Sequence, residues 1–514
     1  MIRLGIDVGG TNTDGVILNE KNQVLCSAKT PTTDDVFTGI ENTIDALLSQ
    51  SHINVEDIQV ATLGTTHCTN AIVERKALNK IGIIRLSLPS GSTVPPLLGW
   101  PEDLIEKLEA VTLLVHGGYE YNGEPIAQLD FAELKQAAEQ FRGRVDSIAI
   151  SGVFSPVLNE QEKAVAAFFE KELPGIPLSL SSEIGSIGLI ERENATILNA
   201  ALMNTINHVS NGFERALQDK GIDARIFLGQ NDGTLMTHQF AQKYPIFTIA
   251  CGPTNSIRGA AHLSQEPNAI VVDIGGTTTD IGVLSNSFPR QTSLAVEVGG
   301  VRTNYRMPDI YSIGFGGGTR VYLNGDSWKI GPESVGYQLT EKAIVFGGND
   351  LTATDVAIGA GVMNIDNIDS SRIEGIPTEK IYPDFVEMVE KAVDRMKTSA
   401  ENLPVVLVGG GAALMPKELK GASRVIRPEH AGVANAIGAA LGDISGNVEK
   451  IYSLDLLTYQ EAIEEAKTEA IEAAIEAGAD LEKIDIIQLE DFPLAYMPGN
   501  AILVRVKAAG PLKL

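Results

Sequence analysis

Two short stretches of the chain repeat one pattern of aspartate, glycine and threonine. The first, GIDVGGTNTDGVIL, begins at Gly5, and the second, VVDIGGTTTDIGVL, begins at Val271. Glycines leave room for backbone N–H groups to approach a polyanion, and threonine hydroxyls add further donors. The pattern therefore predicts two phosphate-binding hairpins that clamp one nucleotide from both sides of a cleft. The residues concerned are Gly9, Gly10, Thr11 and Thr13 in the first copy, and Gly275, Gly276, Thr277, Thr278 and Thr279 in the second.

An aspartate stands two residues before the glycine pair of each copy, at Asp7 and at Asp273. A carboxylate repels phosphate, but both groups can bind one Mg²⁺ ion, usually with water between them. We therefore expect Asp7 and Asp273 to face each other across one Mg²⁺–nucleotide site and to be needed for catalysis. A single copy could equally be an ordinary hairpin turn, whereas two matched copies argue against that alternative. Asp14 and Asp280 close the two copies, either as further cleft carboxylates or as residues that bond to their own turn.

Two further glycine-rich turns fit the same nucleotide site. The strand in VVLVGGGAALMP (405–416) ends in a turn that would let the backbone lie flat against a purine or a ribose. A second turn of this kind is SIGFGGGTRV (312–321). Each of these turns, taken alone, is also typical of a tight connection. The glycines expected at the nucleotide are Gly316, Gly317, Gly409, Gly410 and Gly411.

The loop LGTTHCTNAIVERK (63–76) gathers the polar groups expected around a substrate. Hydroxyls, an amide, an imidazole and a guanidinium together suit a small polar ring that carries a carboxylate. His67 is the candidate catalytic base, and Arg75 could hold the carboxylate through two hydrogen bonds. The alternatives are that His67 fills space, that Arg75 is a charged helix end and that the loop only braces the nucleotide site. The expected substrate contacts are Thr65, Thr66, Asn70 and Arg75.

The elements that must position these residues alternate between strands and helices. Apolar runs flank both glycine turns, which predicts one hairpin at 2–18 and another at 270–284. Amphipathic segments predict helices at 33–50, 159–175, 191–221 and 458–478. The last of these begins with a capping box from Thr458 to Glu461. Such alternation predicts an α/β fold.

The expected organisation has three parts. Residues 1–185 form a first unit with the first hairpin, and residues 186–445 form a second unit with the second hairpin and the adenosine turn. Residues 446–514 form a small α+β appendage, in which we find no residues that suggest chemistry.

Composition narrows the range of partners and locations. The 514 residues carry a formal net charge of −26, which argues against nucleic acid or an anionic membrane as the main partner. The three cysteines, Cys26, Cys68 and Cys251, form no C-x-x-C pair, so disulfide frameworks and zinc or iron–sulfur ligation lack support. Cys251 itself is either a nucleophile beside a loop or a small buried residue. We find no secretory leader and no apolar run near the ~18 residues of a membrane span, so we expect a cytoplasmic location.

A set of motifs, taken in order, carries a resemblance to a known family. They are DVGGTNTDGV, LGTTHCTNAIVERK, SSEIGSIGLIERENATILNAAL, QNDGTLM, VVDIGGTTTDIGVL, IYSIGFGGGTRV and GPESVG. Over roughly residues 1–440 the chain resembles the hydantoinase A / 5-oxoprolinase family, within the actin, sugar kinase and Hsp70 ATPase superfamily. The resemblance implies two ribonuclease-H-like domains around an ATP cleft.

The resemblance also implies a reaction, its cofactors and a partner. Members of the family use ATP, with Mg²⁺, to open or activate cyclic amides such as hydantoins or 5-oxoproline. Phosphorylating the amide oxygen gives a far better electrophile, and the step needs a phosphate clamp and a preorganised site. A B-type hydantoinase subunit is the implied partner, and related subunits serve in ketone carboxylases. A homo-oligomer is compatible with the sequence.

The chain departs from the family pattern at two places. Leu63 stands where the family usually has the histidine of H-G-T-T, and Cys251-Gly-Pro-Thr-Asn-Ser256 replaces S-G-P-A-G-G. We therefore expect this chain to share the ATP site of the family, whereas the family's substrate does not follow from the resemblance. The alternative functions are a small-molecule kinase and a nucleotide-switch activator of a partner enzyme. The missing Cys/His zinc cluster speaks against the first, and the isolated cysteines speak against the second.

Overall fold

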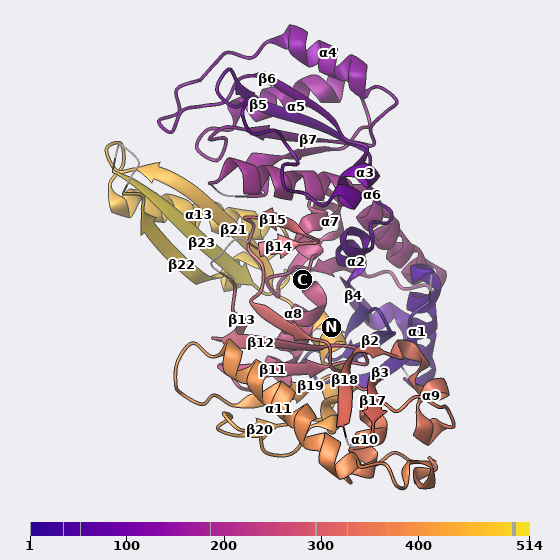
Figure 1. Ribbon diagram of the computed structural model, residues 1–514. Helices are drawn as coiled ribbons and strands as arrows, with labels where there is room; N and C mark the ends of the chain where they lie inside the picture. The colour runs from indigo at the N-terminus through magenta and orange to yellow at the C-terminus, as the bar shows by residue number, and fades with distance from the viewer. Residues whose placement is uncertain are drawn as a thin grey trace.

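The computed structural model describes residues 2–33, 35–51, 53–185, 187–292, 296–325, 327–366, 368–495 and 500–513. A sheet that carries the first hairpin lies in the middle of the molecule, and the sheet of the second hairpin lies below it (Figure 1). A third sheet lies at the top, and the C-terminal strands project to one side. The expected α/β class is confirmed. Residue 34, inside the expected helix 33–50, and residue 186, the expected start of the second unit, lie outside the described residues.

The first hairpin lies within a nine-stranded sheet. It consists of β1 (Ile2–Val8) and β2 (Asn12–Leu18), and β3 (Val24–Pro31) extends it on one side. On the other side β4 (Ile58–Thr65) and β9 (Arg225–Gly229) run parallel to β1. Helix α1 (Val36–Gln50) packs against β1, β2 and β3 through its apolar face, which includes Ile40 and Leu47. The carboxyl ends of β1, β4 and β9 therefore meet at one edge of the sheet, beside the first glycine turn.

The second sheet repeats this order of strands. Its hairpin consists of β11 (Ala269–Ile274) and β12 (Thr279–Ser285), with β16 (Ile310–Ile313) paired to β12. On the other side β19 (Val405–Val408) and β20 (Val425–Ile426) run parallel to β11. The order β16-β12-β11-β19-β20 thus corresponds to β3-β2-β1-β4-β9. Helix α11 (Thr378–Met396) contributes Phe385 and Val389 to the core of this sheet. The repeated sequence motif is the central hairpin of a duplicated α/β core.

A third, all-parallel sheet is inserted between β4 and β9 of the first. Its order is β6 (Val111–His116), β5 (Ile81–Leu88), β7 (Ser147–Gly152) and β8 (Leu178–Leu180), with α3 (Glu102–Leu108), α4 (Phe131–Phe141) and α5 (Glu160–Glu172) in its connections. The long α6 (Leu189–Asp219) leads from this insertion back to the first sheet. A buried ion pair ties the insertion to α6, since Arg85 Nε donates to Glu193 Oε2 at 2.7 Å.

The sheets do not follow the unit boundaries expected at 185 and 445. Strand β9 follows α6 in the chain but returns to the first sheet, because β4 offers it a parallel partner. The C-terminal strands β21 (Ile444–Ser453), β23 (Ala501–Gly510) and β22 (Asp485–Pro493) extend the same sheet through β10 (Leu235–Thr237). Helix α13 (Tyr459–Glu476) covers β21 and β23, and its capping box from Thr458 to Glu461 is confirmed. The appendage is therefore a continuation of the first sheet.

Two short helices cross between the sheets. Helix α8 (Cys251–Ser264) contacts strands of both sheets, and α12 (Ala434–Ala440) packs against α8 and against β1, β2 and β4. A Cβ on Gly259 would overlap the carbonyl oxygen of Ala434, and one on Gly438 would overlap that of Asn255. Glycine at both positions lets the two backbones touch, which brings side chains of α8 and α12 to the hairpins.

The remaining helices and strands lie around these sheets, apart from β13 (Phe288–Pro289), which pairs with β12 in the second sheet. The others are α2 (His67–Glu74), α7 (His238–Lys243), α9 (Leu339–Lys342), α10 (Ala353–Gly359), β14 (Val296–Val298), β15 (Val301–Thr303), β17 (Thr319–Asn324) and β18 (Ser327–Ser334). Among the described residues no helix combines the length and the apolar character that a membrane crossing requires.

Candidate nucleotide site

The two glycine turns have the same backbone geometry. Gly9 N–H donates to the carbonyl of Asn12 at 3.0 Å, and Gly275 N–H donates to the carbonyl of Thr278 at 2.9 Å. The strands on either side are in the same register, since Asp7 pairs with Asp14 and Asp273 pairs with Asp280. Sequence repetition therefore reflects a repeated structure, down to the position of each acidic residue.

The tips of the two hairpins face each other. A Cβ on Gly276 would lie 3.9 Å from the methyl carbon of Thr11, whereas one on Gly10 would meet no atom within 4 Å. Open space thus adjoins the first tip at Gly10, and the second tip lies within contact distance of Thr11. Thr13 differs from the tip residues, because it is fully buried and its hydroxyl lies 3.4 Å from that of Thr32. Thr279 also turns inward and donates to the carbonyl of Phe315 at 2.6 Å.

Asp7 is buried among amide donors. Its side chain is 3% exposed, and Asn255 Nδ2 donates to Oδ1 at 3.0 Å while Asn435 Nδ2 donates to Oδ2 at 2.9 Å. A Cβ on Gly64 would overlap Asp7 Oδ1, so glycine at that position makes room for the carboxylate. Burial raises the pKa of Asp7 to about 7, and the amide donors only partly oppose that rise.

Asp273 occupies the equivalent position on the second hairpin. Burial raises its pKa to about 6, and a hydrogen bond from Ser256 opposes the rise. The charge of Asp273 in turn raises the pKa of Asp7, and both carboxylates respond to the charge of Asp14. The acidic groups of the two hairpins therefore share one electrostatic environment, as expected for carboxylates on either side of one site.

The glycine turn at Gly409–Gly411, which follows β19 and is expected to border the adenosine, lies directly behind Asp273. Gly409 has a φ of +84°, and a Cβ there would overlap Asp273 Oδ1. Gly411 N–H donates to the carbonyl of Ile274 at 2.7 Å, which fixes the turn against the second hairpin. Gly410 stands between them and faces open space, because a Cβ there would meet no atom within 4 Å. Of the three glycines, Gly410 is thus the one placed to border a ligand.

Gly316 and Gly317 brace the second hairpin from behind. Gly317 N–H donates to the carbonyl of Gly275 at 3.0 Å, and Gly316 N–H donates to Thr319 Oγ1 at 2.8 Å. A Cβ on Gly316 would lie 2.7 Å from Thr277 N, so the close packing demands glycine. Because their N–H groups are already used, the expected direct contact with a nucleotide does not fit, and support of the hairpin does.

The polar loop after β4 lies beside the first hairpin. Thr66 N–H donates to the carbonyl of Val8 at 3.3 Å, and Asn70 Nδ2 lies 3.5 Å from Thr66 Oγ1. His67 opens α2, with its Nδ1 2.7 Å from Thr65 Oγ1. Burial lowers the pKa of His67, so the imidazole is neutral near pH 7. The structure therefore brings Thr65, Thr66, His67 and Asn70 together beside the first hairpin, and their contact with a substrate stays a prediction.

Arg75 does not join this group, and its contacts favour the alternative that it is a charged helix end. It ends α2 with a φ of +56°, at the opposite end of the helix from His67. Its Nε donates to Asp103 Oδ2 at 3.0 Å and its Nη2 donates to the carbonyl of Gly299 at 2.9 Å. Arg75 therefore ties α2 to neighbouring segments.

Three other candidate residues, Cys251, Asp14 and Asp280, make contacts that indicate structural roles. Cys251 is 1% exposed, and burial raises its pKa to about 12, so the thiol is no nucleophile near neutral pH. Asp14 pairs with Lys29 at 2.7 Å and accepts from Asn435 at 2.7 Å, while Asp280 accepts from Ser312. Neither aspartate is held by its own turn, which corrects the interpretation that they bond locally.

Two contacts at the site were missed from the sequence. Asn255 and Asn435 donate to Asp7 although 248 and 428 residues separate them from it. A signal existed for each. Asn435 is the one polar side chain in the run GVANAIGAA, and Asn255 lies where the chain departs from S-G-P-A-G-G. Leu63, at the family's histidine position, is fully buried in the core of the first sheet.

Fold and site together define an α/β protein with a duplicated core and two matched acid–glycine hairpins. Family models identify it further. The model of the hydantoinase/oxoprolinase N-terminal region matches residues 3–173, and the hydantoinase/oxoprolinase model matches residues 192–369. Together they match more than half of the chain, which belongs to the hydantoinase/oxoprolinase family.

Several relatives are similar along most of the chain. An uncharacterized protein of Methanocaldococcus jannaschii is 25% identical over 99% of this chain and 82% of its own length. Caprolactamase subunit alpha of Pseudomonas jessenii is 25% identical, with 70% of this chain and 54% of its own length covered. Acetophenone carboxylase gamma subunit of Aromatoleum aromaticum is also 25% identical, with 76% and 58% covered. The chain thus spans little more than half the length of these two enzyme subunits.

Two solved structures share the fold. The ATP-dependent caprolactamase of Pseudomonas jessenii has a TM-score of 0.79 and 19% identity, and covers 99% of this chain and 88% of its own. Nucleotide-free acetone carboxylase has a TM-score of 0.68 and 19% identity, and covers 100% of this chain and 88% of its own. The C-terminal strands are therefore part of the shared architecture.

Proposed function

We propose that this chain is an ATP-dependent hydrolase of a cyclic amide, such as a hydantoin or 5-oxoproline, or the ATPase subunit of such an enzyme. The observation that carries the proposal is the pair of matched hairpins, whose tips face each other with Asp7 and Asp273 behind them. Membership of the hydantoinase/oxoprolinase family supports it, as do relatives that include caprolactamase subunit alpha and 5-oxoprolinase 1 of Arabidopsis thaliana.

The two hairpins suit ATP with Mg²⁺. Gly10 and Gly276 leave the backbone of both tips open to phosphate oxygens, and Gly410 borders the adenosine half of the ligand. Among the described residues no three His, Cys, Asp or Glu side chains converge on a metal position. Asp7 and Asp273 would therefore hold Mg²⁺ largely through water and phosphate oxygens. When bound, the ion neutralises charge that develops on the phosphates.

The reaction we propose balances in three steps. The amide oxygen attacks the γ-phosphorus of ATP, and the bond to ADP breaks. A first water then adds to the amide carbon, and the C–N bond breaks to give an open-chain acyl phosphate and the amine. A second water attacks the acyl carbon, and phosphate leaves with the original amide oxygen. We assign the neutral imidazole of His67, held by Thr65 beside the first hairpin, to accept the proton of the first water.

Oxygen labelling tests this route directly. ATP turnover is measured with Mg²⁺ and with hydantoin, 5-oxoproline or glucose, and the amide oxygen is labelled with ¹⁸O. We expect a cyclic amide to stimulate turnover and its label to appear in inorganic phosphate. Stimulation by glucose with transfer of phosphate to the sugar would instead identify a kinase. No response to any cyclic amide, alone or with a B-type subunit added as the proposed partner, would contradict the proposal.

A further inference from the structure

A large cavity lies at the same sheet edge as the first hairpin but away from the phosphate tips. Its volume is about 1010 Å³, within the size range of small-molecule sites. The segment after β9, the insertion, the segment at 304–306 and the C-terminal strands all line it. Neither glycine turn contributes to its lining. Two of the family motifs, at 181–185 and 230–236, contribute to its lining, but the site itself was not predicted because its walls come from distant parts of the chain.

The register of the strands places the inner end of the cavity close to Asp7. Asp7 lies beside Gly64 of β4, and Leu228 of β9 lies beside Leu63. Since neighbouring strands are about 4.8 Å apart, the end of β9 lies about 10 Å from that of β1. Gln230, Asn231 and Asp232 follow directly and line the cavity. Ligands of α/β sheets bind outside the carboxyl ends of parallel strands, which is where this cavity opens.

Helix α8 connects the cavity to the first hairpin. Thr254 Oγ1 donates to the carbonyl of Asn231 at 3.1 Å, and Asn255 Nδ2, one residue later, donates to Asp7. A Cβ on Gly229 would lie 3.3 Å from Asn255 Oδ1. Cavity wall and phosphate hairpin therefore contact consecutive residues of one helix.

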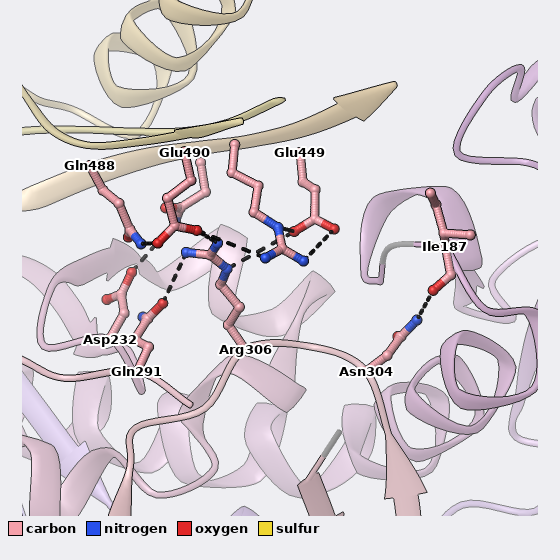
Figure 2. A network of polar contacts seen from close by, with 10 residues as sticks. Ile187, Asp232, Gln291, Asn304, Arg306, Glu449, Gln488 and Glu490 are labelled. Atoms are coloured by element: carbon pink, nitrogen blue, oxygen red, sulfur yellow. Dashed lines mark hydrogen bonds and ion pairs between the residues drawn. The ribbon is translucent and has the colours of Figure 1, made fainter. Parts of the chain in front are cut away.

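Most of the cations in the cavity wall are paired with carboxylates. Lys507 pairs with Asp232 at 2.7 Å, and Arg306 pairs with Glu490 at 2.8 Å. Figure 2 shows Arg306 reaching up to Glu490 and Glu449 under the C-terminal strands. The lining cations Lys243, Lys450 and Arg505 are each paired with a carboxylate as well. Lys163, the other lining cation, is exposed to solvent.

The uncharged part of the wall suits a polar ring. Gln230 and Asn231 are 5% and 4% exposed, and their amide nitrogens donate to the carbonyls of Leu235 and Arg306 at 3.2 and 3.0 Å. Each amide group carries a second N–H and an oxygen besides that bond. Tyr244, Phe247 and Tyr305 contribute aromatic rings that contact one another. Apart from the exposed Lys163, a ligand carboxylate would have to compete for cations that already have carboxylate partners.

We propose that this cavity binds and selects an uncharged cyclic amide, and that the C-terminal strands form the wall that excludes carboxylate-bearing rings. The inference rests on the proposed function for the identity of the ring, and it gives the appendage a role in specificity. The cavity wall at Gln230 lies one strand away from the loop at Thr65–Asn70, toward which the selected ring must move for the proposed phosphorylation.

The test compares 2-pyrrolidone with 5-oxoproline, which is the same ring with a carboxylate added. Binding of each is measured by ligand-observed NMR without nucleotide, so that it does not depend on turnover. We expect 2-pyrrolidone to bind with at least tenfold higher affinity than 5-oxoproline. Asn447→Trp, which fills the cavity from the C-terminal wall, should abolish the binding of 2-pyrrolidone, whereas Asn324→Trp on the exposed β17–β18 hairpin should not.

A charge variant probes the selection. Glu490→Gln removes one of the carboxylates that balance Arg306 and Arg505, so it should shift the preference toward 5-oxoproline by tenfold or more. The matched control is Glu464→Gln on α13, whose partner Lys467 lies outside the cavity. Binding that survives Asn447→Trp, or a preference for 2-pyrrolidone that Glu490→Gln leaves unchanged, overturns the inference. Binding without any stimulation of ATP turnover would leave the cavity in place and contradict the proposed function.

Discussion

The raised pKa of Asp7 makes a quantitative prediction about stability. In the folded protein burial raises this pKa to about 7, against an ordinary value of 3.8. Between these values the folded state keeps a proton that the unfolded state has lost, so the stability that Asp7 contributes is complete below about pH 4 and is lost as pH rises toward 7. The slope is about −1.4 kcal/mol per pH unit, which gives a total of about 4 kcal/mol.

Asp7→Asn removes this titration while keeping the shape of the side chain. We expect the free energy of unfolding of the wild type, measured in urea from pH 5 to pH 8, to fall by about 2.7 kcal/mol more than that of Asp7→Asn. Asp273→Asn serves as a graded comparison, because the pKa of Asp273 rises only to about 6. The fall in stability that is due to Asp273 should therefore end about one pH unit lower than the fall that is due to Asp7.

The same groups link pH to ligand binding. A carboxylate must lose its proton before it can help to hold Mg²⁺, so the affinity of the wild type for Mg²⁺·ATP should rise by up to tenfold per pH unit between pH 5 and 7. Asp7→Asn should flatten this dependence and bind less tightly at pH 8. If Asp7→Asn retains the full pH dependence of stability, the argument that burial controls this carboxylate is refuted.

Three further predictions concern other parts of the site. Gly410→Val should weaken ATP about tenfold, or about 1.4 kcal/mol, and leave tripolyphosphate unchanged in competition binding, because the new side chain blocks the adenosine half only. Gly259→Ala should lower the free energy of unfolding by about 1–3 kcal/mol, since its Cβ overlaps the backbone of α12. His67→Ala should lower cyclic-amide-stimulated ATP turnover about 10²-fold, whereas Arg75→Ala should lower only stability, by about 1 kcal/mol, as thermal unfolding and turnover assays would show. Equal losses of ATP and tripolyphosphate in Gly410→Val, or lost turnover in Arg75→Ala, would contradict these assignments.

Local patterns in the sequence predicted local structure well. The two hairpins, the long helix at 189–219 and the capping box at Thr458 each depend on residues within a few turns of one another. Such features can be read from glycine positions and apolar periodicity. The repeated motif predicted two matched hairpins, whereas the order of the strands around them was not predicted.

Contacts between distant segments could not be predicted in the same way. A strand such as β9 has the same apolar pattern whichever sheet it joins, so its return across α6 to β4 left no local trace. The role of Arg75 depended on Asp103 and Gly299, which lie elsewhere in the chain. Likewise the walls of the cavity come from four separate segments, so no single stretch of sequence contains all of its charged residues.

The first two turns of α8 explain how the chain tolerates its departure from the family motif S-G-P-A-G-G. Here the residues in place of the two glycines are Asn255, which donates to Asp7, and Ser256, which donates to Asp273. Both donors favour the charged carboxylates that burial disfavours. Asn255→Gly restores the family's residue and removes one donor, so the pKa of Asp7 should rise further above 7. The midpoint of Mg²⁺·ATP binding against pH should then move upward, while the affinity of the cavity for 2-pyrrolidone stays unchanged. A midpoint that does not move would mean that Asn435 alone determines the state of Asp7.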